Sequence, residues 1–192
     1  MQIQPQQEVL KEPFLDLLLI LDSSGSLTSH LYDLVSEGAK DALQVGNDDM
    51  LRKYAVINFS TETLSSGWTC SKKVSLQLLI NNFQGAGSAL DSRVLQELSH
   101  ENERYATILV TDGMLYNPQS GVNPALNELK NSSQKGNRVG IIYIGVNLPL
   151  DYKDMGNYAD IYVVNPSAIP KVMKSYTKFL LKGAAKPTAT NF

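Results

Sequence analysis

The sequence predicts an α/β domain whose central sheet is mostly parallel and is flanked by helices on both faces, in a doubly wound arrangement. Short apolar runs alternate along the chain with longer amphipathic stretches, as expected of repeated strand–helix units. The apolar runs are nearly continuous, which is typical of strands buried on both faces. The chain has 192 residues, of which 43% are hydrophobic, and this is sufficient for one such domain.

The strands are predicted from apolar and β-branched runs that end at polar or turn-forming residues. In order, they are expected at 14–21, 54–59, 67–70, 106–111, 138–145 and 160–164. The run 67–70, which contains Trp68, is expected to be a short antiparallel strand at one edge of the sheet.

Helical spacing of apolar residues predicts the helices between these strands. Residues 29–45 carry a stripe of leucine, valine and alanine, and Gly46 ends this helix. A second helix begins at Pro124, a residue type favoured at the first helical position, and Gly136 ends it. The final helix, 168–181, is striped in the same way. Shorter helical segments are expected at 74–82, 89–99 and 151–156.

We expect one domain over residues 14–182, between a Gln-rich tail over 1–13 and a second tail over 183–192. The longest apolar run, 17–21, is far too short to span a bilayer. The first residues lack the basic and apolar regions of a signal peptide, and the only cysteine is Cys70. These features favour a cytoplasmic protein, with an extracellular one as the alternative if the chain is a fragment. A formal net charge of −2 argues against a nucleic-acid partner.

Oxygen-bearing side chains stand in three loops that follow predicted strands or lie between predicted helices. Asp22, Ser24 and Ser26 follow the first apolar run, Ser88 lies in a glycine-rich loop, and Asp112 follows the strand 106–111. The carboxyl ends of parallel strands are where ligands bind in such sheets, so we expect the three loops to converge there. The alternative, that the first three residues only cap a helix, does not account for the other two loops.

The chemistry of this set suits one hard divalent cation, because Mg²⁺ takes oxygen ligands in a near-octahedral geometry. Ser24 and Ser26 are two residues apart, so a turning loop can aim both hydroxyls at one point, and Gly25 eases that turn. Neutral hydroxyl ligands keep the negative charge of the site low, so the ion stays attractive to one further ligand. Mg²⁺ is the expected ion, with Mn²⁺ and Ca²⁺ as alternatives.

This pattern resembles the metal-ion-dependent adhesion site of von Willebrand factor A domains. That family has Asp-x-Ser-x-Ser after the first strand, a Thr in a glycine-rich second loop, and an Asp, often in Thr-Asp-Gly, after a later strand. Asp22, Ser24 and Ser26 match the first element, and Asp112 matches the third. Ser88 stands where a Thr is usual, so the hydroxyl is kept and the methyl group is lost. The resemblance covers roughly residues 16–181.

The resemblance implies a metal-dependent protein–protein interaction module and not an enzyme. A Glu or Asp from a partner protein would complete the coordination of the ion. Tyr116 and Asn117 follow Asp112 in the same loop, so we expect them to contact the partner, with a purely structural role in the loop as the alternative.

A second function class is a Mg²⁺-dependent phosphoryl-transfer enzyme of the haloacid-dehalogenase-like type. Such phosphatases also place an Asp after the first strand and another Asp later in the sheet. They usually show Asp-x-Asp, whereas Ser24 stands two residues after Asp22 here. The sequence also has no Gly-x-x-x-x-Gly-Lys-Ser/Thr loop and no convincing pair of nucleophile and base, so we expect no catalytic residues.

Overall fold

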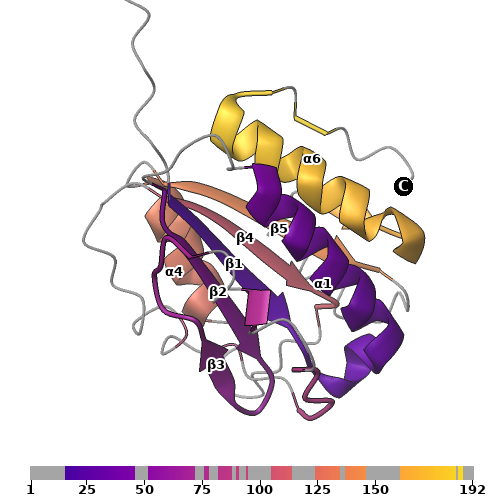
Figure 1. The fold of residues 1–192 in the computed structure, drawn as a ribbon. Helices are drawn as coiled ribbons and strands as arrows, with labels where there is room; N and C mark the ends of the chain where they lie inside the picture. Colours follow the sequence, from indigo (N-terminus) through magenta and orange to yellow (C-terminus); the bar gives the residue numbers. More distant parts are fainter. Residues whose placement is uncertain are drawn as a thin grey trace, which may run out of the picture.

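The computed structural model describes residues 16–45, 52–71, 76–77, 82–87, 90, 94, 105–113, 124–134, 137–145, 161–184 and 186–187. Within these residues, one six-stranded sheet has the order β3-β2-β1-β4-β5-β6 (Figure 1). The strands are β1 (Asp16–Asp22), β2 (Tyr54–Phe59), β3 (Thr63–Ser65), β4 (Tyr105–Thr111), β5 (Arg138–Ile144) and β6 (Ile161–Val163). All neighbouring strands pair in parallel except β2 and β3, which are antiparallel. The predicted fold class is confirmed.

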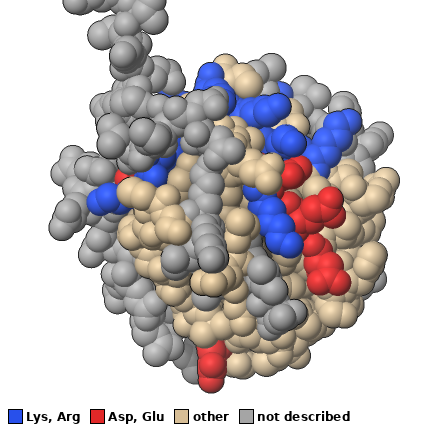
Figure 2. Space-filling model, viewed as in Figure 1, with Lys and Arg blue, Asp and Glu red and all other residues tan. Residues whose placement is uncertain are grey.

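Helices cover both faces of the sheet. On one face, α1 (Thr28–Val45) and α6 (Ile169–Lys182) lie side by side, and on the other lies α4 (Pro124–Gln134) (Figure 1). Short 3-10 helices, η1 (Gly25–Leu27) and η2 (Pro166–Ala168), precede α1 and α6. Charged side chains gather on the outer face of α1 and α6 (Figure 2). Among the described residues, no helix combines the length and the apolar character needed to cross a membrane.

The position of β1 inside the sheet, covered on both faces, explains why its sequence is apolar without interruption. Leu17, Leu19 and Leu21 belong to the hydrophobic cluster under α1 and α6, whereas Leu18 and Ile20 belong to the cluster on the opposite face. Because successive side chains of a strand point to opposite faces, a strand covered on both sides needs an apolar residue at every position. The site described below therefore starts from the end of a strand that is fully buried.

The position predicted for the edge strand was wrong. The antiparallel strand is Thr63–Ser65, and Thr69 makes only an isolated bridge to Tyr54. A tight turn, closed by a hydrogen bond from the Ser60 N–H to the Glu62 carbonyl at 3.0 Å, returns the chain at once beside β2. Trp68, which suggested a strand at 67–70, instead packs its ring edge-on against the ring of Tyr105, with the two ring centroids 5.8 Å apart.

The shorter predicted helices fall mostly outside the described residues. Helical conformation is described at 76–77 and at residue 94, and Asn82 and Leu90 are not helical. The predicted segment 151–156 lies outside the described part of the chain, and the domain boundaries at residues 14 and 182 stay predictions.

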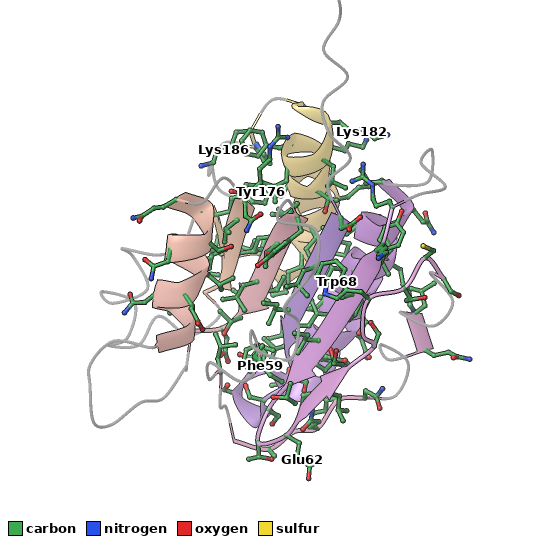
Figure 3. The ribbon with its side chains drawn as sticks, turned by 90° about the vertical axis from the view of Figure 1, so that its left-hand side faces the viewer. Phe59, Glu62, Trp68, Tyr176, Lys182 and Lys186 are labelled. Atoms are coloured by element: carbon green, nitrogen blue, oxygen red, sulfur yellow. The ribbon has the colours of Figure 1, made fainter. Side chains whose placement is uncertain are left out.

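Close packing between α6 and the sheet depends on a glycine in β5. The ring of Tyr176, which is 1% exposed, lies over Gly140, and a Cβ atom at residue 140 would be 1.9 Å from Tyr176 Cε1 (Figure 3). Neither a buried ring nor a central strand can shift easily, since both are enclosed by the core.

We predict that Gly140→Ala lowers the free energy of unfolding by about 1–3 kcal/mol, the usual cost of overpacking a core. Urea denaturation monitored by circular dichroism measures this. Introduced into a Tyr176→Leu background, which removes the ring, the same change should cost clearly less. An equal cost in both backgrounds would contradict the packing explanation.

Candidate functional site

Asp22, the last residue of β1, is the centre of the site. Its side chain is fully buried, and both carboxylate oxygens accept hydrogen bonds. The backbone N–H of Ser24 donates to Oδ1 at 2.8 Å, and the Thr111 hydroxyl donates to Oδ2 at 2.7 Å. Thr111 ends β4, which is the neighbour of β1, so the carboxylate is held across two adjacent strand ends.

The two serine hydroxyls lie together, as the spacing of the motif predicted. Ser24 Oγ and Ser26 Oγ are 3.0 Å apart. The chain turns between them into η1, where the Leu27 N–H donates to the Ser24 carbonyl at 3.1 Å and the Leu27 side chain is fully buried. Ser24 is buried and Ser26 is exposed, so the pair connects the buried carboxylate with the surface.

A glycine-rich loop is attached to this turn by backbone hydrogen bonds. The Gly25 N–H donates to the Ala86 carbonyl at 2.7 Å, and the Gly85 N–H donates to the Ser23 carbonyl at 3.0 Å. A Cβ atom at Gly25 would lie 2.8 Å from the Gly85 carbonyl oxygen, so only glycine permits this approach.

The far end of the same loop is fixed to the end of β2, because the Ser60 hydroxyl donates to the Gly87 carbonyl at 2.6 Å. Ser88, the predicted ligand, is the next residue in the sequence but lies outside the described residues. Tyr116 and Asn117, the predicted partner contacts, also lie outside them.

Asp112 follows Thr111 directly and is partly exposed. The Gly113 N–H donates to the Thr111 hydroxyl at 3.0 Å, while that hydroxyl donates to Asp22. Gly113 has a φ of 86°, in the left-handed region that favours glycine. The Thr-Asp-Gly motif is therefore a local turn that places one carboxylate beside another.

The electrostatics of the site disfavour the charged form of Asp22. The pKa of Asp22 is raised from 3.8 to about 6, first by burial and also by the nearby charge of Asp112. Hydrogen bonds from Ser24 and Thr111 act in the opposite direction and only partly offset these effects. A cation beside the two carboxylates would remove this strain, and the oxygen donors present fit a hard divalent ion.

The residue types at the candidate site also limit which metal ion could bind there. Among the described residues, no three His, Cys, Asp or Glu side chains cluster closely enough to hold an ion. A cation here would rest on two carboxylates and on hydroxyl groups. Such a set favours Mg²⁺, Mn²⁺ or Ca²⁺ over a metal that depends on nitrogen or sulfur ligands.

Sequence analysis missed a buried polar pair behind the site. Asn58 of β2 donates from Nδ2 to the Tyr32 hydroxyl of α1 at 2.5 Å, and the Tyr32 ring packs against Phe83 with centroids 5.5 Å apart. Burial raises the pKa of Tyr32. The pair connects α1, β2 and the segment before the glycine-rich loop. An asparagine within the apolar run 54–59 was the available signal.

No protein-family model and no curated protein matches the sequence, but solved structures match the fold. The pilus adhesin SpaC from Lactobacillus rhamnosus GG has a TM-score of 0.65 at 16% identity, over 90% of this chain and 31% of SpaC. The vWF domain of the type V pili tip protein Mfa5 from Porphyromonas gingivalis has a TM-score of 0.65 at 11% identity, over 93% of this chain and 98% of that domain.

A third match is proximal thread matrix protein 1 from the mussel byssus, in a structure whose MIDAS motif is occupied by zinc. Its TM-score is 0.63 at 15% identity, over 84% of this chain and 46% of that protein. The chain thus spans less than half of SpaC and of the byssus protein. Two matches are pilus proteins and one is from a byssus, so they lend no support to the expected cytoplasmic location.

We predict that Asp22→Asn changes how stability depends on pH in metal-free buffer. The folded-state pKa of Asp22 lies above the unfolded value of 3.8, so its destabilising effect is absent below pH 4 and grows up to about pH 6. Relative to Asp22→Asn, the wild type should lose up to about 3 kcal/mol between pH 4 and pH 7. Urea denaturation at several pH values measures this.

The exposed Asp33 provides the matched control, because Asp33→Asn removes a carboxylate from the surface. Because this variant keeps Asp22, its free energy of unfolding should show the same loss between pH 4 and pH 7 as the wild type. If Asp22→Asn also follows the wild type, the buried carboxylate is not the origin of the effect.

Proposed function

Because the chain has the fold of von Willebrand factor A domains, we propose that it is a protein-binding module that depends on a divalent cation. The observation that carries this proposal is the buried Asp22 carboxylate, which lies beside the charge of Asp112 and the paired hydroxyls of Ser24 and Ser26. Such a site is costly to maintain without a cation and has no packing role that an apolar residue could not fill better.

In the proposed site, Asp22, Ser24, Ser26, Ser88 and Asp112 hold the ion, directly or through water. Mg²⁺ is the proposed ion, with Mn²⁺ and Ca²⁺ as alternatives. For Ser88, the support is the attachment of Gly87, its neighbour in the chain, to Ser60. For Asp112, the support is its electrostatic effect on Asp22.

The ion would act as a bridge. A Glu or Asp carboxylate of the partner protein would take a position that the chain leaves to water, and Tyr116 and Asn117 would surround the contact. The exposed Ser26 hydroxyl marks the side from which the partner approaches.

The rival phosphatase function would need Asp22 as a nucleophile with an oxygen available for attack. Both oxygens instead accept short hydrogen bonds, from Ser24 and from Thr111, and the side chain is 0% exposed. A nucleophile must reach within about 3–3.5 Å of its target. These contacts favour binding over catalysis.

We predict that Mg²⁺ or Mn²⁺ binding, measured by isothermal titration calorimetry, depends on both carboxylates. Asp112→Asn and Asp22→Asn should each weaken binding by more than about 100-fold, because even partners one shell further out contribute 10–100-fold. Asp33→Asn on α1 should bind as the wild type does. Unchanged affinity in Asp112→Asn would refute the assignment of this ligand.

The glycine-rich loop has its own pair of variants. Ser88→Thr keeps the hydroxyl and should bind the ion as the wild type does, whereas Ser88→Ala should bind more weakly. If Ser88→Ala matches the wild type in the same titration, this loop does not contribute to the site.

We predict that partner capture requires both the ion and Asp22. Affinity capture from the native source should yield a protein that is present with Mg²⁺ and absent with EDTA or with Asp22→Ala as bait. A melting curve of the same variant should show an intact fold, since the core consists of apolar strands. Capture that survives both EDTA and Asp22→Ala would show that the interface lies elsewhere, and turnover of generic phosphomonoesters would favour the rival function.

A further inference from the structure

Helices α1 and α6 form one continuous surface of the molecule and run in the same direction. A Cβ atom at Gly38 would lie 3.1 Å from Cα of Pro170, so the two backbones approach closely there. One turn further along both helices, Lys174 Nζ is 3.5 Å from Asp41 Oδ2. The two contacts show which residues of α1 and α6 stand at the same level, that is, at the same height along the two helix axes.

The outer face of α6 carries only positive charge. Its charged residues are all lysines at three- and four-residue spacing, so they form one stripe: Lys171, Lys174, Lys178 and Lys182. The opposite face of the helix is buried, with Val172 and Tyr176 each 1% exposed and Met173 fully buried. The lysine stripe therefore faces solvent.

The outer face of α1 carries a parallel stripe of negative charge. Asp33, Glu37 and Asp41 follow one another at four-residue spacing, and the first two are exposed. Lys40 stands seven residues after Asp33 and shares the exposed side of α1, so three acidic residues and one lysine leave this side net negative. Figure 2 shows red and blue side chains gathered next to each other over these two helices.

Two parallel stripes of opposite sign make this face complementary to itself. Two copies placed face to face can be related by a two-fold axis parallel to the helices. This rotation places α1 of one copy opposite α6 of the other and keeps each residue at the same height along the helix axis. The acidic stripe of each copy then meets the lysine stripe of the other over the heights that the two stripes share, at Glu37 and Asp41 of α1 and at Lys171 and Lys174 of α6. A two-fold axis across the helices would instead place like charges together, so only one closed arrangement is favourable.

We propose that a second copy of this chain docks on the α1–α6 face and forms a two-fold dimer held by these stripes. Glu37 of each copy stands at the level of Lys171 of the other, and Asp41 at the level of Lys174. An anionic partner, such as an anionic membrane or a nucleic acid, fits less well, because the acidic residues of α1 would repel it.

The side chains exposed on this face determine how strongly the two copies associate. Within the described residues of α1 and α6, no large apolar side chain is exposed, since Val164 is the exposed large hydrophobic residue of the described chain. Association therefore depends on charge, is weak at physiological salt, and is lost when salt screens the stripes. The face does not include Asp22 or the loops around it, so the dimer is independent of the proposed metal function.

Analytical ultracentrifugation of the full chain in EDTA tests the proposal. Dimer should be present at an ionic strength of about 0.01 M and disappear at about 0.5 M, because the screening length falls from about 30 Å to a few Å. A wild type that stays monomeric at low ionic strength and high protein concentration overturns the proposal.

Charge reversal identifies the face. Lys171→Glu with Lys178→Glu gives a mainly acidic face, and Asp33→Lys with Glu37→Lys gives a mainly basic one. Each variant alone should be monomeric at low salt, and an equimolar mixture should form a heterodimer. Dimerisation of either variant alone as in the wild type, or no heterodimer on mixing, overturns the proposal.

Glu62 supplies the matched control, since it is exposed at the turn between β2 and β3, far from α6 (Figure 3). Glu62→Lys should dimerise as the wild type does, and loss of its dimer would indicate a net-charge effect.

A last experiment tests binding of the protein to vesicles that contain phosphatidylserine. Binding to them through Lys178 by a protein that remains monomeric would assign the stripe to an anionic surface and refute the dimer.

Discussion

The hydrogen bond between Thr111 and Asp22 is the contact on which the site depends. It joins the carboxyl ends of β1 and β4 and fixes a carboxylate that is fully buried. Burying an ionised group is unfavourable unless donors or a cation compensate. The donors here compensate only in part, because the pKa of Asp22 is still raised to about 6. The charged form of Asp22 is thus only partly stabilised by its neighbours, and this is the physical basis for proposing a cation at the site.

Positioning of the surrounding loops is imposed by backbone constraints. The glycine-rich loop approaches the turn at Gly25 so closely that any side chain there would strike the Gly85 carbonyl. Thr28, at the start of α1, has a φ of 62°, which a β-branched residue rarely adopts. Such a conformation costs about 1–3 kcal/mol and persists only where the surroundings hold it. The turn that carries Ser24 and Ser26 is therefore fixed from both ends, as a site for the proposed ion requires.

The sequence predicted what depends on local pattern. Continuous apolar runs identified β1 and β2, and the position of Asp22 at the end of the first run was enough to place it at the carboxyl edge of the sheet. The edge strand Thr63–Ser65 was missed because it has only three half-buried residues and no glycine, proline or asparagine in the turn before it. The pair Asn58–Tyr32 was missed because it joins residues 26 positions apart. Hydrogen bonds across such separations follow from the packing of whole elements, and no local pattern encodes them.

The direction of α1 links the two proposed surfaces. Figure 1 shows α1 running alongside the strands, beginning at their carboxyl ends. A two-fold axis parallel to the helices is then also roughly parallel to the strands, and it leaves both copies with their strand ends on the same side. Two metal sites would face one direction. A partner presenting two carboxylates at a matching distance would gain from the second contact through effective concentration, by as much as about 10²–10⁴ over a single site. Weak association through the charged stripes would thus strengthen binding to a partner that presents two carboxylates. A partner with a single carboxylate would gain no affinity from the dimer.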